Sequence, residues 1–289
     1  MDESVVDPSK NNHLPKKIEE IAANLKETRP DLFEERMPFW DEDKRTITNA
    51  IARSAVFSVT ERGNREEYKS YKVPAPSNYE ITVIAGKSLT EADRDVYLQV
   101  MHYFRGLKPN DTVAINIKDF LTSIRRIDGS ESRVWLWNAL RAMASTTLDI
   151  AIKHADGSTI KFIGSLLTLV SKEKDGTEEI RMSLPLDALR LYNEDTHTVL
   201  YMNKRLALKG SGSQLAKSLQ IKILSHKEPF PMKLETIMSQ CGSKISEVRF
   251  FKSKLKKALN LLILNKDIDS YTISKDGLVY IKRHDPTNS

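Results

Sequence analysis

The sequence predicts an α+β fold, because the spacing of apolar residues alternates between a helical and a strand period along most of the chain. Residues 206–289 predict a helix, two more helices joined by a glycine turn, and a final hairpin. Residues 78–205 predict the same order of elements without a repeated sequence. That order is typical of a winged helix, so we predict two tandem winged-helix domains behind a partly flexible N-terminal segment, residues 1–77.

The pair of helices near the C-terminus is the clearest local pattern. Apolar residues recur there at helical spacing, first at Leu234, Ile237, Met238 and Cys241, then at Val248, Phe251, Leu255, Leu259 and Leu262. Gly242 between them favours the left-handed backbone that ends a helix, and Ser243 or Ser246 is the expected N-cap of the second helix. A short helix, a glycine turn and a longer helix indicate a helix-turn-helix, although two packed helices of an ordinary core share this pattern.

The outward face of the second helix and the hairpin after it carry residues suited to DNA. Basic side chains neutralise phosphates, and serine, arginine or aromatic side chains near a helix start contact base edges and methyl groups. The candidate DNA-binding residues are Lys244, Ser246, Glu247, Arg249, Phe250, Ser253, Lys254, Lys256, Lys257, Lys275, Lys282 and Arg283. Phe250 points away from the predicted core, which favours a contact with a partner over simple exposure.

Positive charge is concentrated where this helix-turn-helix lies. The formal net charge is +6, yet Leu206 to Ser289 holds 15 basic and 7 acidic residues, whereas the remainder holds 30 and 32. This asymmetry favours an acidic partner such as nucleic acid. The alternative is a basic surface that only keeps the protein soluble.

Residues 78–205 predict a first folded unit. Its expected strands are Tyr79–Ile84, Thr112–Ile117, Leu148–Ile152, Ile160–Val170 and Ile180–Leu184. Its expected helices are Thr90–Arg105, Lys118–Arg126 and Glu131–Thr147, the first of them capped by Thr90. The residues expected to face the core are Val96, Val100, Tyr103 and Phe104 on the first helix, and Val134, Trp137, Leu140 and Ala144 on the third.

Residues 1–77 are broken by six prolines into pieces too short for a core of their own. A short amphipathic helix is expected at Lys16–Lys26. Large apolar residues follow at Leu32 and Phe33, and again between Met37 and Trp40. Such residues in a polar segment belong either to loops docked on the main body or to a short motif that binds a partner.

The sequence contains no recognisable catalytic or metal-binding motif. Its one cysteine excludes an intramolecular disulfide, and none of the six histidines pairs with another at zinc-site spacing. Gly86-Lys87-Ser88 lacks the earlier glycine that a phosphate-binding loop requires, because Ile81 stands there. We therefore expect a protein that is not an enzyme and uses no cofactor. No apolar stretch is long enough to cross a membrane, so we expect a cytoplasmic protein.

Three segments resemble the TrfA family of plasmid replication initiators. The first is Ala52-Arg53-Ser54-Ala55-Val56-Phe57, the second is Leu98 to Arg105, and the longest is Ser225 to Ser243. The resemblance implies that the C-terminal winged helix places its second helix in the major groove of directly repeated origin sequences, called iterons. It also implies that the N-terminal winged helix supports dimerisation and contacts the DNA backbone, where its basic residues are Lys118, Arg125, Arg126 and Arg133.

The resemblance also implies partners in a bacterial, plasmid-associated setting. Such initiators bind iterons as monomers in equilibrium with a homodimer, help to melt an AT-rich region, and recruit the host proteins DnaA and DnaB helicase. The dimers restrain replication and so control plasmid copy number. The family has a sliding-clamp motif with glutamine at its first position. The matching residues here are Arg29, Asp31, Leu32 and Phe33.

Two other classes of protein remain open at this point. A winged-helix transcriptional repressor would use the same helix face, but it would bind inverted repeats as a dimer. A nicking enzyme would need a metal-binding histidine pair and a nucleophilic tyrosine, and the histidine spacing argues against it.

Overall fold

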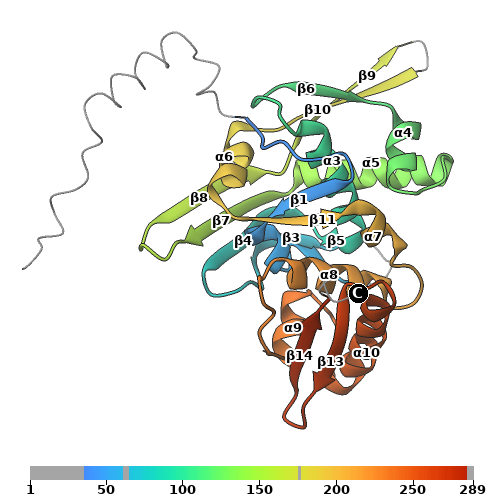
Figure 1. The fold of residues 1–289 in the computed structure, drawn as a ribbon. Coiled ribbons are helices and arrows are strands. Elements are labelled where there is room, and N and C mark those ends of the chain that lie inside the picture. Colours follow the sequence, from blue (N-terminus) through green and yellow to red (C-terminus); the bar gives the residue numbers. More distant parts are fainter. Residues whose placement is uncertain (1–35, 61–64, 175–176, 285–289) are drawn as a thin grey trace, which may run out of the picture. The chain divides into compact units, whose positions relative to one another are not determined.

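A helix, a short strand, two helices and a hairpin follow one another twice in this chain (Figure 1). The computed structural model describes residues 36–60, 65–174 and 177–284. The first copy consists of α3 (Glu91–Phe104), β6 (Thr112–Ile115), α4 (Ile117–Ser123), α5 (Ser130–Ser145), β9 (Thr168–Lys174) and β10 (Thr177–Ser183). The second consists of α8 (Ser213–Leu224), β12 (Met232–Lys233), α9 (Leu234–Gln240), α10 (Val248–Leu264), β13 (Ile268–Ile273) and β14 (Leu278–Arg283).

The strands of both copies pair in the same way. The sheet orders are β6-β10-β9 and β12-β14-β13, so in each copy the short strand pairs with the last strand of the hairpin. The expectation of one order of elements used twice is therefore confirmed at the level of topology. The sequence does not repeat, because each copy needs only the period of its apolar residues to be kept.

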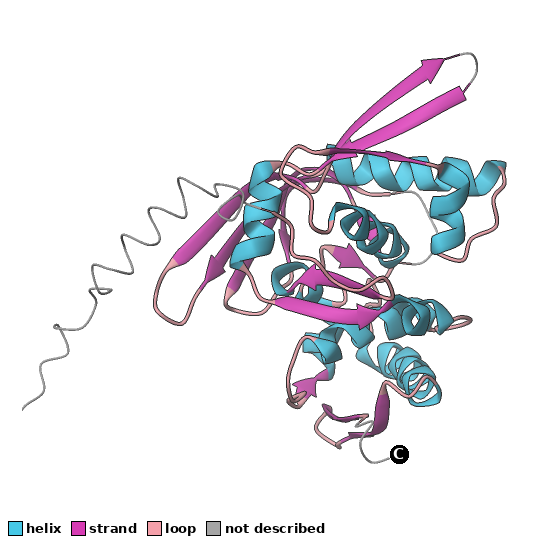
Figure 2. Cartoon of the chain, turned by 45° about the horizontal axis from the view of Figure 1, so that its top comes forward, coloured by secondary structure: helices cyan, strands magenta, loops and turns pink. Residues whose placement is uncertain are grey.

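The first copy is interrupted by a second sheet. A hairpin, β7 (Thr147–Lys153) and β8 (Thr159–Ser165), follows α5 and pairs with β4 (Tyr79–Lys87), which in turn pairs with β3 (Glu67–Val73). The result is an antiparallel sheet of order β3-β4-β7-β8. Figure 1 labels its strands, and Figure 2 draws the strands in magenta. The single strand predicted at Ile160–Val170 is therefore wrong. It is two strands in two different sheets, and they are separated by buried Leu166 and Leu167.

Residues 44–73 differ from the extended segment expected at the N-terminus. They form β1 (Lys44–Thr48), α2 (Asn49–Arg53), β2 (Phe57–Ser58) and β3. Strand β1 pairs with β11 (His197–Tyr201), which lies about 150 residues later in the chain, and β2 pairs in parallel with β5 (Leu89–Thr90). Composition alone could not reveal these partners, because they come from distant parts of the sequence.

The apolar residues just before β1 do dock on the main body. Met37 and Trp40 are buried, and the indole Nε1 of Trp40 donates to Nδ1 of His102 at 3.1 Å. Phe39 between them is 76% exposed. The predicted helix at Lys16–Lys26 and the motif from Arg29 to Phe33 lie outside the described residues.

Helix α3 begins where the sequence predicts. The Asp93 carboxylate accepts hydrogen bonds from the Thr90 N–H at 2.7 Å and from the Thr90 hydroxyl, which closes a capping box. Val96, Val100 and Phe104 are buried as expected. The polar side of the helix is buried as well, including Glu91, Arg94 and Asp95, so α3 is enclosed on all sides.

The predicted inner face of α5 is partly wrong. Val134 is 60% exposed, and the buried residues are Leu136, Ala139, Leu140, Ala142 and Met143. The buried stripe of α5 is rotated about the helix axis relative to the expected one. Trp135 and Trp137 are only half-buried, because they lie against arginine side chains. A tryptophan ring can pack on the protein while its edge remains exposed to solvent. The presence of tryptophan therefore does not determine which face of a helix is buried.

Two hydrophobic cores lie on either side of α8. The first core contains Ile221 and residues between Met37 and Leu206, and the second contains residues between Leu208 and Val279. Leu215, Leu219 and Ile223 of α8 belong to the second core, whereas Ile221 belongs to the first. Between the two duplicated units, α6 (Leu186–Glu194), β11 and α7 (Met202–Ala207) complete the first core.

Candidate nucleic-acid interface

The two helices α9 and α10 are joined by the turn that the sequence predicts. Gly242 has φ +62°, and its N–H donates to the Ser239 carbonyl at 2.8 Å. Helix α10 then begins with Glu247 as its N-cap, so neither Ser243 nor Ser246 holds the position predicted for it. The apolar stripe is confirmed, because Phe251, Leu255, Leu259 and Leu262 are fully buried in the second core.

The residues predicted to face outward on α10 are at the surface. They are Arg249, Phe250, Ser253, Lys254, Lys256 and Lys257, all exposed. Ser246, just before the helix, is also exposed, and Phe250 has 54% of its surface accessible. Along one helix, an arginine, an aromatic ring and a serine near the start are followed by three lysines. This is an arrangement that can contact base edges first and phosphates further along.

Glu247 and Phe250 hold the side chain of Arg249. The guanidinium Nε of Arg249 lies 2.6 Å from a carboxylate oxygen of Glu247, and its Cζ lies 4.7 Å from the centre of the Phe250 ring. Both members of the ion pair are solvent-exposed, so the pair is weak and a better acceptor can replace it. Glu247 thereby orients Arg249 at the N-terminal end of α10.

Local partners engage the basic residues of the hairpin β13–β14. Lys282 lies 3.7 Å from Asp269, and the same carboxylate accepts a hydrogen bond from His284 that lowers the pKa of Asp269. Lys275 is exposed at the hairpin turn. Arg283 is exposed near the base of the hairpin, where it donates to the His226 carbonyl at 3.5 Å.

Lys244, a predicted DNA-binding residue, forms an exposed ion pair with a residue from the first half of the chain. Its ammonium group pairs with the carboxylate of Glu66, which precedes β3 and belongs to the other half of the chain. Hydrogen bonding to Lys244 lowers the pKa of Glu66. This pair therefore connects the turn before α10 to the first core.

The four basic residues expected in the first unit gather around α4, α5 and their connection. Lys118, Arg125 and Arg133 are exposed, and Arg125 has a left-handed backbone with φ +54°. Arg133 forms two hydrogen bonds to Asp128, at 2.7 and 2.8 Å, and these lower the pKa of Asp128. Arg126 lies 3.5 Å above the Trp135 ring. By topology, this corner of α4 and α5 is the counterpart of the corner of α9 and α10.

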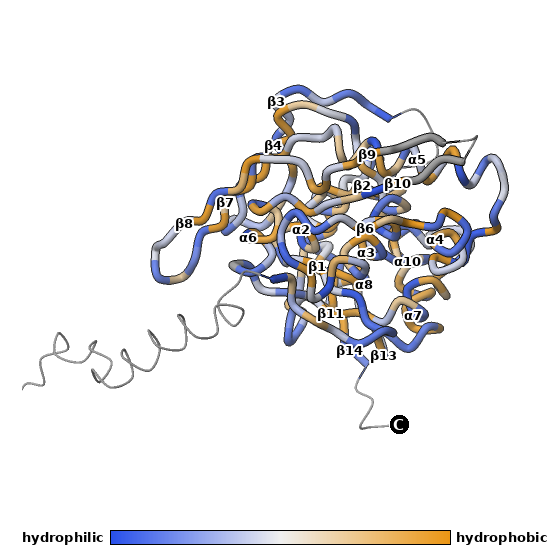
Figure 3. The backbone as a smooth tube through the Cα atoms, turned by 90° about the horizontal axis from the view of Figure 1, so that it is seen from above, coloured by the Kyte–Doolittle hydropathy of each residue, from blue (hydrophilic) through white to orange (hydrophobic). Residues whose placement is uncertain are grey.

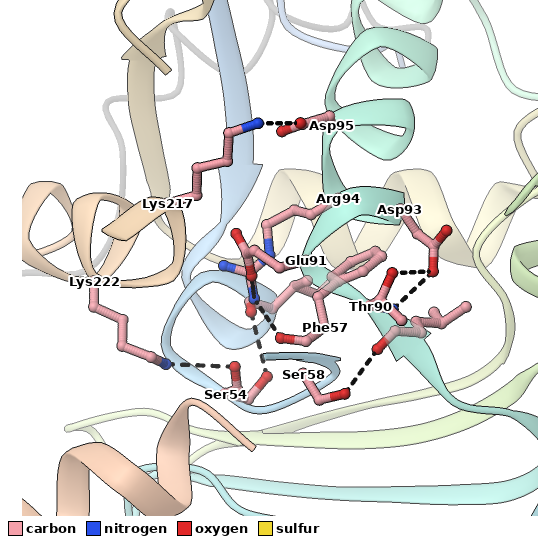
Figure 4. Close-up of polar contacts among 12 residues, drawn as sticks. Ser54, Phe57, Ser58, Thr90, Glu91, Asp93, Arg94, Asp95, Lys217 and Lys222 are labelled. Carbon is pink, nitrogen blue, oxygen red and sulfur yellow. Dashed lines mark hydrogen bonds and ion pairs between the residues drawn. The ribbon is translucent and has the colours of Figure 1, made fainter. Parts of the chain in front are cut away.

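The seam between the two cores holds a buried ionic network that sequence reasoning missed. Arg205 is fully buried and donates to Glu91 at 2.7 Å and to Asp95 at 2.6 Å, and Lys217 of α8 pairs with the same Asp95. Arg94 lies beside Glu91 at 3.4 Å. Figure 4 shows Lys217 directed at Asp95, and Arg94 beside Glu91 nearer the start of α3.

The ion pairs of this network have a structural role. Burial alone would raise the pKa of Asp95, but Arg205 and Lys217 overcome that effect and hold the pKa below its usual value. In the sequence, Glu91 and Asp95 look like acids in the first turns of a helix, so no local signal pairs them with residues more than 100 positions later. A charged residue on the polar side of a predicted helix is the only hint.

No metal centre accompanies these surfaces within the described part of the chain. There, no group of three histidine, cysteine or acidic side chains could hold a metal ion, and no helix is long and apolar enough to cross a membrane. Cys241 is buried, and burial raises the pKa of its thiol. A pocket of about 300 Å³ between β8 and α6 lies in the first unit, apart from the α9–α10 corner.

These features define a class of α+β protein that uses one order of elements twice and exposes a basic helix in the second copy. A family model described as TrfA protein matches residues 6–283. The chain therefore belongs to the TrfA family, which is a family of plasmid replication initiators.

One curated protein and one solved structure are similar to this chain. The plasmid replication initiator protein TrfA of Escherichia coli is 23% identical over 283 residues, which cover 93% of this chain and 72% of that protein. Among solved structures, domains 2 and 3 of RctB superpose with a TM-score of 0.51 at 15% sequence identity, over 79% of this chain and 95% of that one. At that identity the second comparison shows similarity of fold alone.

Proposed function

We propose that this plasmid replication initiator acts by binding directly repeated origin DNA through α10 and the hairpin β13–β14. The observation that carries the proposal is the exposed face of α10, where Arg249, Phe250 and Ser253 precede three exposed lysines directly after a tight glycine turn. In this view α10 lies in the major groove, and residues near its start read the bases. Its later lysines contact phosphates and set the affinity.

We further propose that both duplicated units are winged helices. The order α8, β12, α9, α10, β13, β14 and the sheet order β12-β14-β13 support this for the second unit. The matching sheet order β6-β10-β9 supports it for the first, with the β3-β4-β7-β8 sheet as an addition. The domains would be residues 78–205 and 206–289, with residues 1–77 before them.

The first unit would add contacts to the DNA backbone and support a homodimer in equilibrium with the binding-competent monomer. The corner of α4 and α5 is the topological counterpart of the corner of α9 and α10. Its basic residues Lys118, Arg125 and Arg126 are therefore suited to contact phosphates. Arg133 would first have to exchange its bonds to Asp128 for a phosphate. Opening of the origin would follow, with recruitment of DnaA and DnaB helicase by a cytoplasmic protein that performs no catalysis itself.

A sliding-clamp contact through Arg29, Asp31, Leu32 and Phe33 is a further part of the proposal. It rests on the match of Leu32 and Phe33 to the motif of the family, with Arg29 in place of its glutamine.

A hydroxyl-radical footprint on the non-coding DNA of the protein's own plasmid tests the central proposal. Protection of several repeats in the same orientation beside an AT-rich tract is the expected result. If instead the protein protects one palindrome upstream of a gene, it is a dimeric repressor and the initiator mechanism is wrong.

A further inference from the structure

Backbone contacts tie the turn of the helix-turn-helix to the first core. The Val59 N–H donates to the Cys241 carbonyl at 2.8 Å. The residue that follows β2 is therefore hydrogen-bonded to the C-cap residue of α9. Gly242 follows immediately and lies against Ser58. A methyl group at Gly242 would come within 2.6 Å of Ser58 Cβ and 3.1 Å of Ser58 Cα, so only glycine fits this approach.

The same short segment of the first core also holds the end of α8. The guanidinium of Arg53 donates to the hydroxyl of Ser225 at 3.1 Å and to its carbonyl. In the other direction, the buried ammonium of Lys222 donates to the carbonyls of Arg53 at 2.7 Å and Ser54 at 3.4 Å (Figure 4). Arg53 to Val59 therefore contacts two of the three helices that form the second unit.

This segment is itself fixed from behind. The Ser58 hydroxyl donates to the Leu89 carbonyl at 3.1 Å, and the buried guanidinium of Arg94 donates to the Phe57 carbonyl at 3.1 Å (Figure 4). Backbone pairing of β2 with β5 adds to these bonds. Because this segment is hydrogen-bonded to both cores, it fixes the position of one core relative to the other.

The two basic corners lie on the same side of the chain. Figures 1 and 3, which differ by a quarter turn, place α4 and α10 one beyond the other on that side. From the contacts above and this placement, we infer that Arg53–Val59 is a positioning element. It holds the α9–α10 turn so that the reading face of α10 and the basic corner of α4 and α5 meet one DNA duplex in a fixed register.

This inference rests on the proposed function and adds a physical reason for tight binding. Two contact surfaces that are held in a fixed relative position bind as one unit. Two loosely joined surfaces pay an additional entropic cost, because they must be ordered at each binding event. Loosening the seam should therefore remove contacts made by the first unit and leave the contacts of α10 in place. No residue of the positioning element needs to touch DNA for this effect.

Gly242→Ala tests the inference, because it places a methyl group against Ser58. We expect a footprint that keeps the protection due to α10 but loses the flanking protection due to α4 and α5. Affinity for the full site should fall about tenfold or more, toward that for a short duplex that carries only the central bases. Independently of DNA, the Val59 amide should exchange its hydrogen faster, because its acceptor on Cys241 moves away.

Two controls separate docking from backbone strain. Gly157→Ala introduces a side chain at φ +86° with nothing within 4 Å, so it should behave as wild type. The double variant Ser58→Gly/Gly242→Ala keeps the strain at position 242 but removes the Ser58 Cβ that the methyl group would meet most closely. Because it also removes the hydroxyl bonded to Leu89, it is compared with Ser58→Gly alone, and these two variants should show the same flanking protection. If Gly242→Ala fails to fold by circular dichroism, Arg53→Ala, with Arg53→Lys as its conservative partner, takes its place.

The outcomes are distinct. Unchanged flanking protection in Gly242→Ala, or equal loss over the whole site that is also found when the double variant is compared with Ser58→Gly, overturns the positioning element. If Arg53→Ala is the variant tested, unchanged flanking protection overturns it as well. Failure of the wild-type protein to protect any direct repeat is a different result, because it refutes the proposed function itself.

Discussion

Arg205→Met is the sharpest test of how the two cores are joined. The substitution keeps a long side chain of similar volume but removes the guanidinium that donates to Glu91, to Asp95 and to the Lys217 carbonyl. Arg205 is fully buried, and Glu91 is 1% exposed, so water cannot replace the lost partner. Leaving buried carboxylates with too few donors costs about 3–5 kcal/mol, which is a large part of the roughly 5–15 kcal/mol that stabilises an ordinary domain.

Urea unfolding followed by circular dichroism measures this loss, with the unfolding midpoint and slope determined for both proteins. Lys282→Ala is the matched control, because it removes one member of an exposed ion pair 3.7 Å from Asp269 and should leave the midpoint unchanged. A loss below about 1 kcal/mol in Arg205→Met would refute the reasoning, since it would mean that the seam admits water or that its carboxylates are protonated.

The network and the α10 face make three further predictions. Burial lowers the pKa of Lys222 to about 8 from 10.5, so the unfolded chain binds more protons between those values; stability should rise from pH 8 to 10, and Lys222→Met should flatten that slope in urea titrations. Arg249→Ala should cost about 1–3 kcal/mol in binding and relax preference at one base position, as measured on a panel of substituted repeats, and equal weakening of every sequence would contradict this. Lys257→Ala should weaken binding to all sequences alike and reduce the salt slope, roughly −5 to −7 for about 5–8 phosphate contacts, by about 1.

The sequence determined the local elements of this protein and the exposed face of α10. The period of Phe251, Leu255 and Leu259 specified the buried side of α10, and hence which side is exposed, because a helix with one apolar stripe can be buried only on that stripe. Gly242 marked the turn for an equally local reason, since its left-handed backbone is one that most residues avoid. The duplicated order of elements was visible for the same reason.

Only the tertiary structure decided which distant segments meet. The pairing of β1 with β11, the addition of the β3-β4-β7-β8 sheet and the burial of Glu91 with Arg205 all join residues separated by tens to more than 100 positions. No local period encodes such pairings, because a strand or a charged side chain carries no mark of its partner. The segment Arg53–Val59 shows the difference. Its residues up to Phe57 resembled the sequence of a family, but its place between two cores became evident only in the folded chain.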